Sequence, residues 1–151
     1  MNKKLFYIIV FLISVLFLSG CCCSSIGTSD TELVRVREII NGFWSAINNE
    51  NWTSANAYCL YDPWDKFVRP YEDDLQVLRA ICPDAIVSVY AYVSDISFID
   101  AYTAEAKIQV NTIVLGCGPS NETKVQFGTM KLRHFQYSGF NDWLIMSIDL
   151  K

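Results

Sequence analysis

His134 is the only histidine of this 151-residue chain and the first residue to consider for acid–base chemistry. An imidazole titrates near neutral pH, so it can accept a proton as a general base. In the predicted strand it shares a face with Met130 and Leu132. One ionisable group without an identified partner is weak evidence for catalysis, so we favour a structural hydrogen bond for His134.

Asp95 is the second candidate for proton transfer. It continues the two-residue alternation of Val87, Val89, Ala91 and Val93, which is typical of a half-buried strand. If that face is internal, the carboxylate points into the interior of the domain. The alternative is that Asp95 marks the point where the strand leaves the core.

Other chemistries lack the residues they need. A zinc site requires closely paired ligands, whereas the domain cysteines stand alone at Cys59, Cys82 and Cys117. The run 116–118 (Gly-Cys-Gly) begins like a dinucleotide-binding loop, but Asn121 replaces the third glycine. We therefore predict no metal and no cofactor.

The N-terminal segment determines where the protein is expected to reside. Lys3 and Lys4 precede an apolar run that ends in Leu-Ser-Gly-Cys at 18–21, the three parts of a secretory signal. This ending resembles the lipobox of bacterial and archaeal lipoproteins. The resemblance implies cleavage before Cys21, lipidation of its sulfur and a membrane-anchored protein on the extracytoplasmic face. An uncleaved membrane helix and cleavage by an ordinary peptidase are the alternatives.

Composition limits the partners of the mature chain. Without Lys3 and Lys4 it keeps 10 basic against 16 acidic residues, a net charge of −6. Nucleic-acid binding depends on neutralising phosphates, so we predict no nucleic-acid partner. We divide the chain into a signal peptide (1–20), a small, polar, flexible tether (21–29) and one domain (30–151). Within the tether, Cys22 and Cys23 are left open as acylation or disulfide sites.

The domain begins with helical periodicity and ends with strand periodicity. Helices are predicted at about 30–48, at 52–60 and between Pro70 and Pro83. Strands follow at 86–97, at 104–116, from about 125 and from 143 to 150. The apolar phase slips by one residue beside Gly128, which indicates a β-bulge there. The order predicts an α+β fold with N-terminal helices packed on a curved antiparallel sheet.

This order of elements, the run Asn49-Glu50-Asn51-Trp52 and the closing 143–148 segment (Trp-Leu-Ile-Met-Ser-Ile) resemble the nuclear-transport-factor-two-like superfamily. That superfamily forms a cystatin-like cone and includes ketosteroid isomerases and SnoaL-like cyclases. The resemblance covers about residues 30–150 and includes no catalytic signature. It implies an apolar pocket inside the cone. The ligand-binding residues expected from the pattern are Phe43, Trp44, Met130, Leu132 and His134.

Export permits disulfides, and strand pairing indicates which cysteines can meet. Strands 86–97 and 104–116 should pair about a turn near Asp100, which brings the segment after Cys82 beside Cys117. We predict that these two bond and that Cys59 stays a buried thiol, with Cys59–Cys82 as the rival pair. Asn51 and Asn121 begin glycosylation sequons, relevant only in a host that glycosylates exported proteins.

Three functions fit this sequence. The leading interpretation is a non-enzymatic, lipid-anchored extracytoplasmic domain that binds a small apolar or amphipathic ligand or a protein partner, with a homodimer among the options. The second is a SnoaL-like or ketosteroid-isomerase-like enzyme that uses His134 or Asp95. The third is a structural envelope lipoprotein whose cone is filled with side chains.

Overall fold

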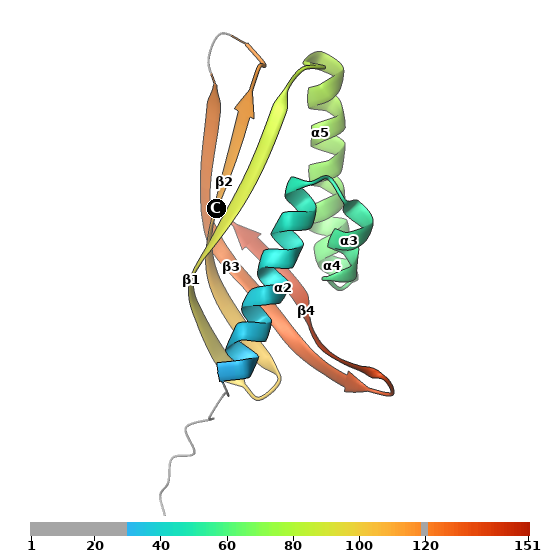
Figure 1. The fold of residues 1–151 in the computed structure, drawn as a ribbon, viewed down its shortest axis with the longest axis vertical. Coiled ribbons are helices and arrows are strands. Elements are labelled where there is room, and N and C mark those ends of the chain that lie inside the picture. The colour runs from blue at the N-terminus through green and yellow to red at the C-terminus, as the bar shows by residue number, and fades with distance from the viewer. Residues whose placement is uncertain (1–29, 119–120) are drawn as a thin grey trace, which may run out of the picture.

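A computed structural model describes residues 30–118 and 121–151 of the chain (Figure 1). The predicted signal peptide, the tether and the lipidation site Cys21 lie outside these residues. The first described element is helix α2 (Asp30–Asn48), whose bounds match the prediction. Its buried side chains lie on one face because apolar residues recur at three- and four-residue spacing. They are Val36, Ile39, Ile40, Phe43, Trp44, Ala46 and Ile47.

A run of short helices follows: α3 (Trp52–Ala57), α4 (Tyr61–Pro63), the π-helical turn η1 (Trp64–Val68) and α5 (Arg69–Ile81). Asn51 caps α3 through its side chain, which accepts a hydrogen bond of 3.1 Å from the Ser54 amide. The sequence predicts that the second short helix ends at Asp62-Pro63, because the residue before proline is biased away from helix. Pro63 lies instead within the first turn of a continuous helical path from 61 to 81, where its missing N–H has no helical partner to lose.

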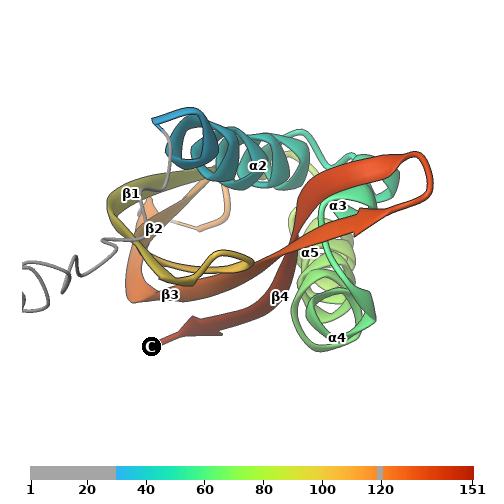
Figure 2. The same cartoon turned by 90° about the horizontal axis from the view of Figure 1, so that it is seen from below.

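The second half of the chain is a four-stranded antiparallel meander in the order β1-β2-β3-β4. Its strands are β1 (Ile86–Asp100), β2 (Thr103–Leu115), β3 (Glu122–Tyr137) and β4 (Phe140–Leu150). Ile86 pairs with Leu115 and Asp100 with Thr103, so the predicted pairing about a turn near Asp100 is confirmed. The α+β fold class, with helices packed on a curved sheet, is likewise confirmed (Figure 2).

The bulge predicted beside Gly128 is wrong. Pairing of β2 with β3 runs without interruption past Ile108–Gly128, and the side chains of Val125 and Phe127 are exposed on the outer face. Gly128 has a different reason: a Cβ atom there would lie 1.8 Å from the carbonyl oxygen of Asp149. The glycine permits close approach of the β4 end to β3.

The core lies between α2 and the inner face of the sheet. The inner side chains of β2 and β3 are almost fully buried, and Trp143 and Ile145 of β4 complete the layer. The β2 and β3 members are Ala104, Ala106, Ile108, Val110, Met130 and Leu132. Burying each larger apolar side chain contributes about 1.5–3 kcal/mol, so this layer is the main source of stability.

Candidate functional site

His134 lies between two aromatic rings at the end of the sheet where α2 begins. Its ring stacks on Trp143, with centroids 5.1 Å apart, and on Tyr102, with centroids 6.4 Å apart. Its backbone amide donates a hydrogen bond of 2.8 Å to the carbonyl oxygen of Tyr102. The half-buried imidazole borders an open hollow of about 320 Å³, together with Glu32 and Asn141.

A charged pair borders the same hollow. Arg35 of α2 forms a bidentate interaction with Asp142 of β4: its Nε donates to Oδ1 at 2.9 Å and its second nitrogen donates to Oδ2. Burial alone would raise the pKa of Asp142, but hydrogen bonds from Arg35 and from the Trp143 amide outweigh it, and the pKa lies below its usual value.

The indole of Trp143 connects this pair to the core. Its Nε1 donates a hydrogen bond of 2.6 Å to Oε2 of Glu32. Trp143 itself is only 1% exposed. The arrangement joins the first turn of α2 to β4 by polar contacts. It fixes side chains in place, as expected for a structural role, and the hollow beside it is open to solvent.

Of the two placements considered for Asp95, the inner one is wrong. The pairing of β1 with β2 shifts between Val93 and Asp95, so Ser94 is an extra residue that reverses the alternation. Asp95 is exposed and forms an ion pair of 3.4 Å with Lys107 of β2. Ile96 and Phe98 take the inner positions instead and pack against the core.

The side chains expected to line an apolar pocket fill the core. Phe43, Met130 and Leu132 have 0% exposure, which leaves no room beside them for a probe the size of water. Trp44 is 4% exposed, and its Nε1 lies 3.3 Å from Sδ of Met130. The prediction that Phe43, Met130 and Leu132 line a ligand cavity is therefore wrong, because their volumes occupy the space between helix and sheet. Trp44 borders an open hollow of about 300 Å³, together with Val89 and Ala91 of β1.

A hollow that the sequence reasoning missed lies at the far end of the sheet. It measures about 530 Å³ and is lined by Thr112 and Val114 of β2 and by Glu122, Thr123 and Lys124 at the start of β3. Without a bulge at Gly128, the inner positions of β3 continue through Gln126 to Lys124 and Glu122. If the alternation of β3 is continued without a bulge, the sequence itself shows that the inner side chains change from apolar to polar toward this end.

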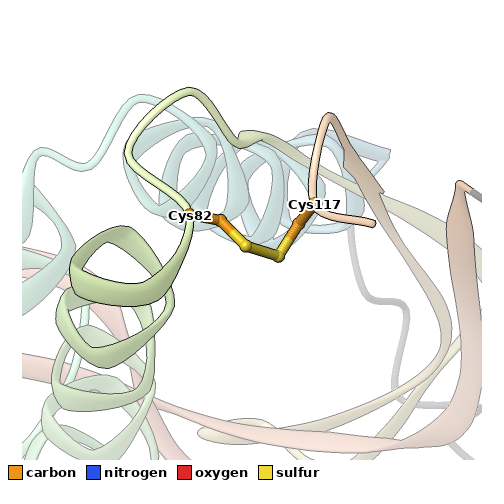
Figure 3. The surroundings of a disulfide bond; sticks show 2 residues. All are labelled: Cys82 and Cys117. Carbon is orange, nitrogen blue, oxygen red and sulfur yellow. A yellow bond between two sulfur atoms is a disulfide. The ribbon is translucent and has the colours of Figure 1, made fainter. Parts of the chain in front are cut away.

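The disulfide lies at the same end. Cys82 follows α5 and Cys117 follows β2, and the structure bonds them with their Cα atoms 5.5 Å apart, as the strand register predicts (Figure 3). Cys59 is a buried thiol, also as predicted, and burial raises its pKa to about 11. The sequon residues Asn51 and Asn121 are both exposed.

Two further features concern membranes and metals. Within residues 30–118 and 121–151, no helix is long and apolar enough to cross a membrane. Over the same residues, no group of three His, Cys, Asp or Glu side chains is close enough to hold a metal ion.

Comparison with known proteins identifies the fold. No family model and no curated protein matches the sequence. Among solved structures, an NTF2-like protein of unknown function from Shewanella oneidensis is similar, with a TM-score of 0.55, 12% identity and coverage of 76% of this chain and 95% of the other. A proposed dehydratase of the NTF2-like family from Streptomyces avermitilis gives a TM-score of 0.57, 12% identity and coverage of 80% and 95%.

A third similar structure has a different description. It is an IcmL-like type IV secretion system protein from Legionella pneumophila, with a TM-score of 0.55, 11% identity and coverage of 83% and 94%. At these identities the likeness concerns the fold alone. The chain therefore has the nuclear-transport-factor-two-like cone, which hosts proteins with different descriptions.

Proposed function

We propose that this protein is a lipid-anchored, extracytoplasmic protein-binding domain without catalytic activity. The observation that carries the proposal is an apolar cluster on the outer face of the sheet, here called the outer-face patch. It consists of Tyr90 and Tyr92 on β1 and Val125 and Phe127 on β3, which are between 47% and 61% exposed. Contiguous exposed apolar clusters of this kind mark interaction sites.

The strand register places the two apolar rows of the outer-face patch on either side of β2. Asn111 of β2 pairs with both Tyr90 and Val125, and Gln109 pairs with both Tyr92 and Phe127. Gln109 donates a hydrogen bond of 2.9 Å to Asn111, so the amides between the apolar rows are already paired. Aromatic enrichment and the lack of charge at the centre are features of protein interfaces.

The charges lie toward one side of the patch. Lys107 pairs with Asp95, and Lys131 pairs with Glu105 at 3.6 Å, further along the same outer face. Exposed apolar rows around an uncharged centre, with charges at one edge, are features expected of a surface that a protein partner covers. A second copy of the chain is one such partner, because two-fold self-association is the commonest form of soluble oligomer.

Two placements favour binding over catalysis. Asp95 is on the exposed outer face, and His134 is held between two rings beside an open hollow. A catalytic base needs a partner that orients it and an enclosed space for the substrate. The filled interior around Phe43 also argues against a large apolar ligand inside the cone.

Site-specific photocrosslinking in the native host would test the proposed function. A benzophenone amino acid at Phe127 should give a crosslinked species, either with a second copy or with another exported protein, which mass spectrometry identifies. The matched control is Tyr61 of α4, which is 73% exposed on the helical side. Crosslinking at Phe127 no stronger than at Tyr61 would refute the proposal.

The anchor has a separate test. Cys21→Ser should abolish labelling of the protein by a clickable fatty acid, because the thiol that accepts the lipid is gone. Cys22→Ser is the matched control and should retain the label. Undiminished labelling of the Cys21→Ser protein would remove the anchor from the proposal and leave the outer-face patch unaffected.

Small-molecule binding at the far-end hollow is the second candidate function. Its volume of about 530 Å³ falls in the range of ligand sites, and it combines Val114 with the charged Glu122 and Lys124. Mass spectrometry of the gently purified protein should then detect a bound small amphipathic molecule. Lys124→Ala should reduce its occupancy, whereas Lys66→Ala on η1 should not. A ligand-free protein would reject this candidate.

A further inference from the structure

One end of the molecule carries exposed aromatic and aliphatic side chains on two turns, close to the start of α2. Ile99 is 57% exposed and Tyr102 is 55% exposed beside the β1–β2 turn, and Tyr137 is 63% exposed beside the β3–β4 turn. The rings of Tyr137 and Phe140 stack across that turn, with centroids 5.3 Å apart. Both turns and the start of α2 lie at the lower end in Figure 1.

These side chains are held in position. The Tyr102 amide donates a hydrogen bond of 2.7 Å to Oδ1 of Asp100, which closes the β1–β2 turn. The carbonyl oxygen of Tyr102 accepts the hydrogen bond from the His134 amide, and the two rings stack. His134 and Val34 border the same hollow, which connects this turn to the first turns of α2. Tyr102 is therefore an exposed ring on a rigid support.

The length of chain before α2 limits how far this end can lie from the proposed anchor. Asp30 lies nine positions after Cys21 in the chain. A chain of nine residues spans at most about 30 Å when fully extended. A lipid on Cys21 thus keeps this end within about one bilayer thickness of the lipid surface.

We propose that this end docks on the lipid surface, with Ile99, Tyr102, Tyr137 and Phe140 at the level of the headgroups. The inference rests on the proposed lipid anchor. Tyrosine is suited to this position because its ring is apolar and its hydroxyl stays hydrated. Among the described residues, Asp30 and Asp100 lie at this end and Arg133 pairs with Thr103 beside the β1–β2 turn, so the end carries no marked positive charge and docking depends on apolar contact and not on anionic lipid.

Depth-dependent fluorescence quenching tests the inference with the native lipidated chain in vesicles of zwitterionic phosphatidylcholine. Tyr102→Trp places a reporter at the docking end, and Phe127→Trp places a matched reporter on the outer-face patch. The four native tryptophans give the same background in both proteins and in the wild type. Lipids brominated near the headgroup end of the acyl chain act as quenchers.

We expect emission from the Tyr102→Trp protein to fall on reconstitution in brominated lipid. The emission that the Phe127→Trp protein shows in excess of the wild type should stay unchanged. Bromines near the chain end should quench the Tyr102→Trp protein less, because the ring stays shallow. Replacing a third of the lipid by an anionic one should leave the quenching the same. Equal quenching of both reporters, or of neither, would overturn the inference.

The mass of the N-terminal peptide from the same preparation separates two kinds of failure. A peptide that begins with lipidated Cys21, combined with an unquenched Tyr102→Trp protein, refutes the docking and leaves the anchor intact. A peptide without lipid refutes the proposed anchor, and the docking inference falls with it. Quenching together with a lipidated peptide supports both.

Discussion

Removing the Cys82–Cys117 disulfide by substituting alanine at both positions should destabilise the domain strongly. The bond joins the end of α5 to the end of β2 across a sequence separation of 35 residues. For a loop of this length, the chain-entropy relation gives a loss of about 3.8 kcal/mol in the free energy of unfolding at 25 °C. Leu75 is the buried residue of α5, while Val77 and Ile81 are 59% and 73% exposed, so packing offers this helix little replacement.

Urea denaturation followed by tryptophan fluorescence measures this loss. With a slope near 2 kcal/mol per molar, the midpoint should fall by about 2 M in the double variant. Reductant should lower the wild-type midpoint by a similar amount and leave that of the double variant unchanged. Cys59→Ala is the control: it removes a buried thiol outside the disulfide and should cost only about 1 kcal/mol.

A decrease of less than about 1 kcal/mol in the double variant would refute the reasoning. It would mean either that α5 detaches without unfolding the sheet or that the bond does not form in the native protein. Peptide mapping without reduction distinguishes these outcomes, because only the first yields a linked pair of peptides containing Cys82 and Cys117.

Two further predictions concern single side chains. Gly128→Ala should reduce the free energy of unfolding by more than 2 kcal/mol, measured by urea denaturation, because a Cβ would collide with the Asp149 carbonyl 1.8 Å away. The lowered pKa of Asp142 stabilises the fold at pH values above the usual carboxyl pKa of about 4. This contribution is lost as the pH falls through the pKa that Asp142 has in the folded protein. Acid should therefore reduce the stability of the wild type more than that of Asp142→Asn. Equal acid sensitivity of the two proteins would show that Arg35 contributes nothing through this pair.

The sequence predicted those features that depend on a regular repeat. The spacing of apolar residues defined α2 from Asp30 to Asn48, and the alternation in β1 and β2 gave a register that placed Cys82 beside Cys117. Both repeats persist over a dozen residues or more, so neighbouring positions support one another. The helices and the sheet could therefore be predicted with their order and topology.

The bulge predicted beside Gly128 rested on residue type alone. Val125 and Phe127 share one phase of the alternation and Met130 and Leu132 share the other, and a bulge would bring both sets to one face. Apolar side chains also occupy protein surfaces, and Val125 and Phe127 belong to the outer-face patch. An irregularity in β1, the extra residue at Ser94, leaves no compositional signal and places Asp95 on the exposed face.

Whether the interior is filled depends on side-chain volumes and their packing. A pattern of apolar positions in the sequence does not give this information. Ala104 and Ala106 are small, yet both have 0% exposure, so no space remains beside them. Trp44 and Met130 lie in contact within the same core. The indole nitrogen of Trp44 and the sulfur of Met130 are separated by 86 positions in the sequence. Such a contact is decided by the three-dimensional packing of the whole core.

The start of α2 and the two hairpin turns lie at one end of the long axis, and the ends of α5 and β2 lie at the other (Figure 1). Thr112 and Lys124 border the far-end hollow, on the side of the disulfide. Under the proposed function, an anchor at Cys21 precedes α2, so the lipid surface faces the end where α2 begins. The outer-face patch and the far-end hollow then remain accessible from the aqueous side. Docking on lipid and binding of a partner then use separate surfaces, so a substitution at Tyr102 should leave crosslinking at Phe127 unchanged.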